Sequence, residues 1–196
     1  MDIPYSIEPR ADTGVTNATL GMWLFIASEV MLFGSLFSSY ALLRTGAGTW
    51  PDQGAILNVP LASANTLVLL ASSAAMIGGS RALTAGRLHD FRRAFGIVLL
   101  LGVVFLGVKG VEYAEEIGRG LRPATNNFLG LYFTLTGLHA AHVVGGLIVN
   151  AWLMATSSRT WATGPVRLQN RVRAAAIYWN FIDAIWLAMF VTLYLL

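Results

Sequence analysis

Five long apolar stretches are the feature of this sequence that most limits the folds open to it. A bilayer core of roughly 30 Å is crossed by about 20 helical residues, and each stretch is long enough to do so. A chain surrounded by lipid must satisfy its backbone hydrogen bonds within itself, so each stretch is expected to be a helix. We place the five helices near residues 20–43, 61–80, 94–114, 128–154 and 174–196.

The composition agrees with a protein that lies in a membrane. Hydrophobic residues make up 56% of the 196 residues and charged residues only 12%, too few to build an ordinary water-soluble surface. The sequence therefore predicts an all-α, polytopic membrane protein, a five-transmembrane-helix bundle that forms a single membrane domain over residues 1–196. Residues 1–19 form a polar tail without the pattern of a cleaved signal peptide, so we expect the first helix to be the targeting signal.

The basic residues predict the orientation of the bundle. The tail and the second and fourth linkers hold most of the arginines, namely Arg10, Arg81, Arg87, Arg92, Arg93, Arg159, Arg167, Arg171 and Arg173. The opposite side holds Arg44, Arg119 and Arg122. Because basic residues favour the cytoplasmic side, we expect the amino terminus in the cytoplasm and the carboxyl terminus outside. We interpret these arginines as signals of membrane topology and not as a surface that binds nucleic acid, so we expect no nucleic-acid partner.

Four ionisable side chains are predicted at a similar depth in the bilayer. Glu29, His139, His142 and Asp183 each lie about ten or more residues inside a predicted helix, which at 1.5 Å per residue is roughly 15 Å deep. Such groups are costly in lipid and usually serve a purpose. We interpret them as a buried polar layer that is related to proton handling or, alternatively, as hydrogen-bonded side chains that hold helices together.

The two histidines, three residues apart on one helical face, raise the question of a cofactor. A haem held between helices needs a histidine on each of two helices, and the remaining histidine, His89, falls in a predicted linker. Zinc generally takes three or four protein ligands, so a metal shared with Glu29 or Asp183 is the weaker interpretation. The sequence contains no cysteine, which excludes iron-sulfur clusters and thiol catalysis. We therefore expect no haem and no metal site in this chain.

Two further pairs of charged residues stand near the predicted helix ends. Lys109 and Glu112 are three residues apart, so they lie on one helical face near the outer end of the third helix, where we expect a local salt bridge. Arg92 and Arg93 are candidates for contact with lipid headgroups at the cytoplasmic face, although topology alone also explains them.

Five segments together resemble the successive signatures of a known family. They are ASEVMLFGSLFSSY (27–40), ANTLVLLASS (64–73), VKGVEYAEE (108–116), TGLHAAHVVGG (136–146) and AAAIYWNFIDAIWLAMFVTLYLL (174–196). In this order they resemble haem-copper oxidase subunit III, the cytochrome c oxidase subunit III-like family, in its short five-helix bacterial form. Carried over by motif, Glu29, Glu112, His139, His142 and Asp183 match polar residues of that family.

The resemblance implies an accessory subunit of a proton-pumping cytochrome c oxidase that reduces oxygen to water in aerobic respiration. Such a subunit is a non-catalytic part of the enzyme. The haems and copper sit in partner subunits, while this subunit packs on subunit I, in a complex with subunit II and other respiratory subunits. It binds structural phospholipid and supports proton uptake and enzyme durability in the bacterial cytoplasmic (inner) membrane.

Two alternatives stay open at this point. One is subunit III of a quinol oxidase or of a nitric oxide reductase-associated relative. The other, from a different class, is an independent membrane proton or ion transporter, although the inverted repeat that transporters often show is not recognisable here.

One position departs from the family. The family commonly has histidine where Asn180 stands, and an asparagine can form hydrogen bonds but cannot carry a proton at working pH. A proton-relay role at this position is therefore doubtful.

Overall fold

The computed structural model describes residues 8–196, and in this range the secondary structure is entirely helical. In chain order the helices are α1 (Asn17–Gly46), α2 (Gln53–Ile56), α3 (Val59–Thr84), α4 (Leu88–Gly118), α5 (Asn127–Thr163) and α6 (Pro165–Phe190), followed by the π-helix η1 (Val191–Leu195). Within the described residues, five helices are long and apolar enough to cross a membrane: α1, α3, α4, α5 and the continuous segment formed by α6 and η1. The predicted five-helix, all-α fold is thus confirmed, whereas the orientation stays a prediction.

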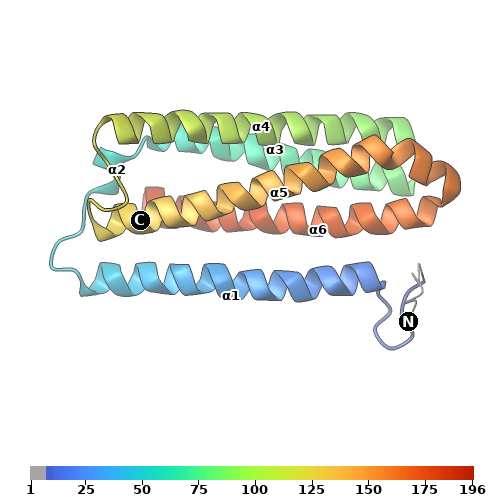
Figure 1. Cartoon of the computed structure of the whole chain (residues 1–196), viewed down its shortest axis with the longest axis horizontal. Coiled ribbons are helices and arrows are strands. Elements are labelled where there is room, and N and C mark those ends of the chain that lie inside the picture. Colours follow the sequence, from blue (N-terminus) through green and yellow to red (C-terminus); the bar gives the residue numbers. More distant parts are fainter. Residues whose placement is uncertain (1–7) are drawn as a thin grey trace.

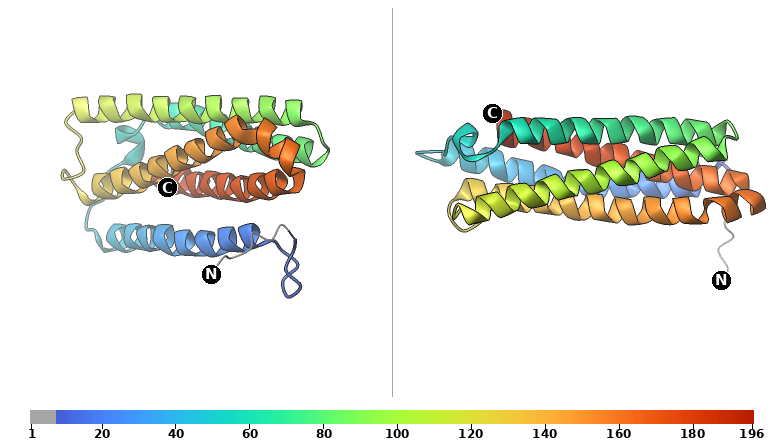
Figure 2. Two further views of the ribbon diagram at one scale, coloured as in Figure 1. Left: turned by 45° about the vertical axis from the view of Figure 1, so that its right-hand side comes forward. Right: turned by 90° about the horizontal axis from the view of Figure 1, so that it is seen from above.

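The five long helices run lengthwise beside one another (Figure 1). Helices α3, α4, α5 and α6 form the main body of the bundle, and α1 packs at its side, mainly against α6 and α5. Figure 2 shows the same arrangement from two other directions, with α2 and the loops on either side of it at one end of the bundle. The amino terminus of α1 lies at the opposite end.

The helices extend further than predicted. Helix α4 begins at Leu88, so His89 lies in its first turn and not in a linker, and α5 continues to Thr163. The expected loop over residues 156–173 is helical except at Gly164. The prediction of these linkers was wrong because it followed the apolar stretches, whereas a helix can continue beyond the hydrocarbon core into the polar interface.

Short polar side chains fix where several helices begin. Thr16 Oγ1 accepts a hydrogen bond from the backbone N–H of Thr19, and Asn126 Oδ1 accepts one from Leu129. These caps satisfy amide groups that have no partner within the helix. The caps define the first turns of α1 and α5, which supply the two sides of the site described below.

Glycines allow the helices to approach one another around Trp179 of α6. A Cβ atom at Gly146 of α5 would lie 2.9 Å from both Cε3 and Cζ3 of Trp179, and one at Gly102 of α4 would lie 3.2 Å from Cη2 of the same ring. Trp179 itself is 1% exposed. The absence of a side chain at these glycines therefore sets the packing of α4, α5 and α6.

Candidate functional site

Glu29 of α1 and His142 of α5 form a close polar contact between the two helices. Nε2 of His142 lies 2.9 Å from Oε2 of Glu29, although the two groups are not aligned as a hydrogen bond. Nδ1 of His142 lies 2.8 Å from the carbonyl oxygen of Leu138. Since a carbonyl oxygen only accepts, Nδ1 must donate, and Nε2 then faces Glu29 either as an acceptor or as the second N–H of an imidazolium. The contact therefore places an imidazole nitrogen beside a carboxyl group between α1 and α5.

Aromatic side chains enclose this pair. The ring of Phe33 lies 5.4 Å from the ring of His142, and the hydroxyl of Tyr178 donates to the carbonyl oxygen of His142 over 3.1 Å. The side chains of Glu29 and His142 are 11% and 16% exposed. The pair is thus largely enclosed within the chain but has a narrow exposed edge between α1 and α5.

Asp183 lies in a different contact, between α6 and α3. Its Oδ2 accepts a hydrogen bond from Ser73 Oγ, and its Oδ1 has no hydrogen-bond partner among the described residues. One turn earlier on α6, Nε1 of Trp179 donates to Oγ of Ser72 over 3.0 Å. Asp183 therefore belongs to a polar contact that joins α3 to α6.

His139 is fully buried in an aromatic environment. Its ring lies 5.6 Å from the ring of Phe105 and 5.2 Å from that of Trp186, and neither ring nitrogen has a hydrogen-bond partner in the part of the chain that the structure describes. Nε1 of Trp186 donates to Oγ1 of Thr66 over 2.9 Å and so fixes the neighbouring ring. His139 is separate from the polar contacts of Glu29 and Asp183.

The four residues expected to form one polar layer thus divide into three environments. Only Glu29 and His142 meet, while Asp183 bonds to α3 and His139 packs among aromatic rings. Asn180 donates from Nδ2 to the carbonyl oxygen of Ala176 over 2.7 Å, within its own helix. A role of these groups in proton handling stays a prediction.

Lys109 and Glu112 form an ion pair with an Nζ–Oε2 distance of 2.8 Å. The contact is deeply buried rather than near the surface, because the two residues are 4% and 2% exposed. Nζ of Lys109 also donates to the hydroxyls of Tyr132 and Tyr194, over 3.0 and 2.9 Å. Residues from α4, α5 and η1 are therefore joined at this point.

Sequence reasoning missed three members of this cluster: Glu116, Tyr132 and Tyr194. Glu116 follows Glu112 by four residues and Lys109 by seven, so helical spacing alone would have placed all three on one face. The tyrosines had no comparable signal, because they come from α5 and η1. We call these five residues the Lys109 cluster.

Arg92 and Arg93 lie near the start of α4, and both are exposed. Nη1 of Arg92 donates to Oγ of Ser158 on α5 over 2.9 Å. Their contact with lipid headgroups stays a prediction.

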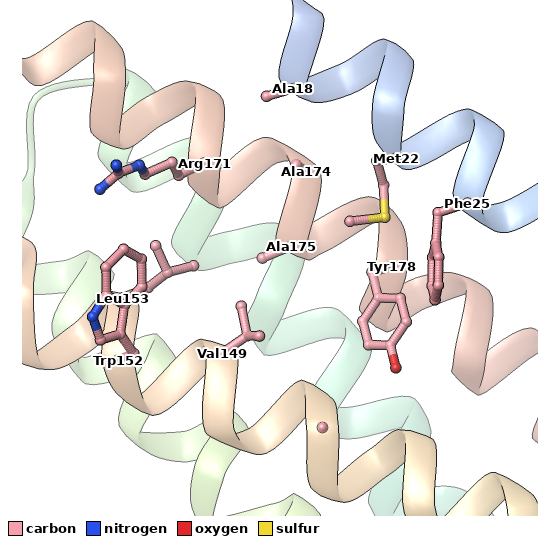
Figure 3. Close-up of a pocket in the computed structure, with 11 residues that line it drawn as sticks. Ala18, Met22, Phe25, Val149, Trp152, Leu153, Arg171, Ala174, Ala175 and Tyr178 are labelled. Carbon is pink, nitrogen blue, oxygen red and sulfur yellow. The ribbon is translucent and has the colours of Figure 1, made fainter. Parts of the chain in front are cut away.

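A largely apolar cavity of about 510 Å³ lies between α1, α5 and α6 (Figure 3). Arg171 lies at one end of it, with its guanidinium carbon 5.2 Å from the centre of the Trp152 ring. Phe25 and Tyr178 lie at the other end. The remaining lining residues are Ala18, Met22, Gly145, Val149, Leu153, Ala174 and Ala175.

No three histidine, aspartate or glutamate side chains among residues 8–196 come together as a possible metal site. The Glu29–His142 pair offers two donor groups, fewer than the three or four protein ligands that zinc generally takes.

Comparisons with known proteins identify the family. A sequence model described as "Cytochrome c oxidase subunit III" matches residues 10–196. "Cytochrome c oxidase subunit 3" of Bacillus sp. (strain PS3) is 32% identical, with 98% of this chain and 92% of the relative covered. The protein of the same name from Thermostichus vulcanus is 35% identical, with 90% and 86% covered. "Cytochrome bo(3) ubiquinol oxidase subunit 3" of Pseudomonas aeruginosa is 29% identical, with 92% and 85% covered. This chain therefore belongs to the cytochrome c oxidase subunit III family of the haem-copper oxidases.

Proposed function

We propose that this chain is the accessory, non-catalytic subunit of a proton-pumping cytochrome c oxidase, and that it packs against subunit I in a complex with subunit II. The observation that carries the proposal is the family match, which extends from residue 10 to residue 196 and so includes all five long helices. The haems and copper would then belong to partner subunits. Neither the nitric oxide reductase alternative nor the independent transporter is favoured by the comparisons.

The electron donor is part of this proposal. Relatives named for cytochrome c and one named for ubiquinol share the family. We assign cytochrome c to this chain because the relatives from Bacillus and Thermostichus, which are the more similar in identity, carry that name.

Purification of the complex tests the function. When the chain carries an affinity tag and is extracted in mild detergent, we expect a subunit with a haem-copper spectrum to elute with it. Elution of the tagged chain without any haem protein, or with a haem bound to the separated chain, would overturn the proposal.

The proposed function also includes the membrane in which the chain lies and the side of that membrane on which its amino terminus is found. The family and its bacterial relatives favour the bacterial cytoplasmic membrane, with the amino terminus in the cytoplasm. The distribution of arginines supports this orientation, since Arg92 and Arg171 lie at the end of the bundle where α1 begins.

We further assign a phospholipid to the cavity between α1, α5 and α6. Its apolar lining suits an acyl chain, and Arg171 lies at the end where a lipid phosphate would face the cytoplasmic surface. We expect Arg171→Gln to reduce the anionic lipid that native mass spectrometry detects on the complex, whereas Arg122→Gln, at the opposite end of the bundle, should leave it unchanged. Equal lipid in both variants would contradict the assignment.

The Glu29–His142 pair is expected to support turnover rather than the chemical step. In Glu29→Ala, His142 loses its acidic partner, while the redox centres of other subunits are not touched. Initial oxygen reduction should stay near the wild-type rate, and the number of turnovers before inactivation should fall. Oxygen-electrode traces measure both quantities, with exposed Glu115→Ala as the control. Complete loss of initial activity in a normally assembled complex would argue against this role.

A further inference from the structure

We propose that the Lys109 cluster binds one exchangeable proton on Glu116, and that this proton exchanges with water through Tyr194. The site lies at the end of the bundle where α2 is found, away from the Glu29–His142 pair. It involves α4, α5 and η1 and uses groups that the proposed function leaves without a role.

The charges of the cluster do not balance without a proton. It contains one ammonium group, on Lys109, and two carboxyl groups, on Glu112 and Glu116, which are 2% and 3% exposed. An uncompensated buried charge is strongly unfavourable, so a second carboxyl group beside one lysine is expected to be neutral.

The neighbouring helices do not supply a second buried cation. His139 of α5 is buried among aromatic rings and has no hydrogen-bond partner among the described residues, and Arg44 of α1 is only half-buried and donates to the hydroxyl of Tyr40. Arg119, the residue directly after α4, is exposed, and its guanidinium donates to the carbonyl oxygen of Ile56. Tyr113 presents its ring to Lys109, with Nζ 5.1 Å from the ring centre. In α3, the titratable residue Arg81 lies near the opposite end of the helix. The surplus negative charge is therefore left to a proton.

The hydrogen bonds show which oxygen is available for that proton. Lys109 donates to Oε2 of Glu112 and to both tyrosine hydroxyls. Tyr194 in turn donates to Oε1 of Glu112 over 2.8 Å, and Tyr132 donates to Oε1 of Glu116 over 2.8 Å. Every donor of the cluster is thus used, and Oε2 of Glu116 has no partner among the described residues. This oxygen is the free position for an additional proton.

A cavity lies beside one member of the cluster, Tyr194. Tyr194 lines a cavity of about 390 Å³ together with the polar residues Arg44, Asp52 and Gln53. This volume is ample for water, and the polar groups provide hydrogen-bond partners. Tyr194 is therefore the member of the cluster that can exchange protons with water.

Within the cluster, the hydroxyl groups complete the route. The hydroxyl of Tyr132 lies 3.2 Å from both Oε1 of Glu112 and the hydroxyl of Tyr194. When the carboxyl group of Glu116 rotates, its protonated oxygen can face the hydroxyl of Tyr132 and donate to it. Tyr132 then passes its own hydroxyl proton to Tyr194, and Tyr194 releases one proton to water, so that both tyrosines end as they began. Only O–H bonds form and break, so no oxidant or reductant is required.

Infrared spectroscopy of the purified complex tests the site. A protonated carboxyl group has a C=O stretching band that shifts in D₂O, whereas a carboxylate does not. We expect such a band in the wild type, its loss in Glu116→Gln, and its retention in Glu115→Gln, which changes an exposed neighbour. Absence of the band in the wild type, or its loss in Glu112→Gln but not in Glu116→Gln, would overturn the assignment.

Two tyrosine variants provide readouts that do not depend on Glu116→Gln assembling. In Tyr132→Phe, the band should shift, because Oε1 of Glu116 loses its hydrogen bond. In Tyr194→Phe, the band should remain. The rate at which the band shifts after transfer into D₂O, which reports replacement of the Glu116 proton by deuterium, should fall about tenfold or more, because a positioned proton-transfer group is lost. An unshifted band in the first variant overturns the location of the proton, and unchanged exchange in the second overturns the route.

Discussion

Replacement of Lys109 by methionine should destabilise the chain by about 3–5 kcal/mol, the range typical of breaking a buried ion pair by removal of one partner. Glu112 and Glu116 would lose the only buried cation near them in the described part of the chain, and both tyrosine hydroxyls would lose a donor. The change should lower the temperature at which the detergent-solubilised complex loses this chain, and it should lower the amount of chain found in the membrane.

A double variant separates the charge from the packing. Lys109→Met combined with Glu112→Gln removes both charged partners and should recover part of the lost stability, because a buried pair replaced as a unit is often nearly neutral. Arg119→Met, which removes an exposed cation directly after the same helix, should have little effect. If Lys109→Met is as stable as the wild type, or if the double variant is no better than the single one, the ion pair is not a stabilising element.

Gly146→Ala should also be strongly destabilising, by about 1–3 kcal/mol, as is usual when a group is forced into a packed core. The new Cβ would lie 2.9 Å from two ring atoms of Trp179. This ring cannot easily move, because it is 1% exposed and its Nε1 donates to Ser72. The separation of α5 from α6 must therefore increase, and the loss of packing should destabilise the chain. Thermal unfolding of the purified complex should then show a lower midpoint temperature.

The adjacent glycine provides the matched control. A Cβ atom at Gly145 would meet only the hydroxyl of Tyr178, at the ordinary contact distance of 3.9 Å. Gly145→Ala should thus be tolerated on the same turn of the same helix. Equal stability of the two variants would show that close approach at Trp179 does not limit the packing of α5 against α6.

The number of the long helices could be predicted from the sequence because the length of an apolar stretch is a local property, whereas the short helix α2 and the π-helix η1 were not predicted. The ends of the helices could not be predicted in the same way. Residues 156–173 contain Gly, Pro and several arginines, which predicted a loop, yet both α5 and α6 extend through most of this segment. A polar composition moves a segment out of the hydrocarbon core without ending the helix.

For the candidate site, the direction in which each side chain points could not be predicted from the sequence, and the common depth in the bilayer stays a prediction. Residue counts placed Glu29, His139, His142 and Asp183 at a similar level, but how each helix is rotated depends on packing around bulky rings such as Trp186. The structure turns His139 toward that ring and His142 toward Glu29, although the two histidines are only three residues apart. Local spacing also identified the contact of Lys109 with Glu112, while its tyrosine partners come from distant parts of the chain.

Removal of this chain from the purified oxidase tests most directly the claim that it is an accessory subunit. The complex would be stripped of the chain with detergent, and haem, copper and oxygen consumption would be measured before and after. We predict that all haem and copper stay with the remaining subunits and that the initial rate is largely retained, while the number of turnovers before inactivation falls and recovers when the chain is added back. Haem that leaves with the chain, or an initial rate that disappears on its removal, would contradict this account.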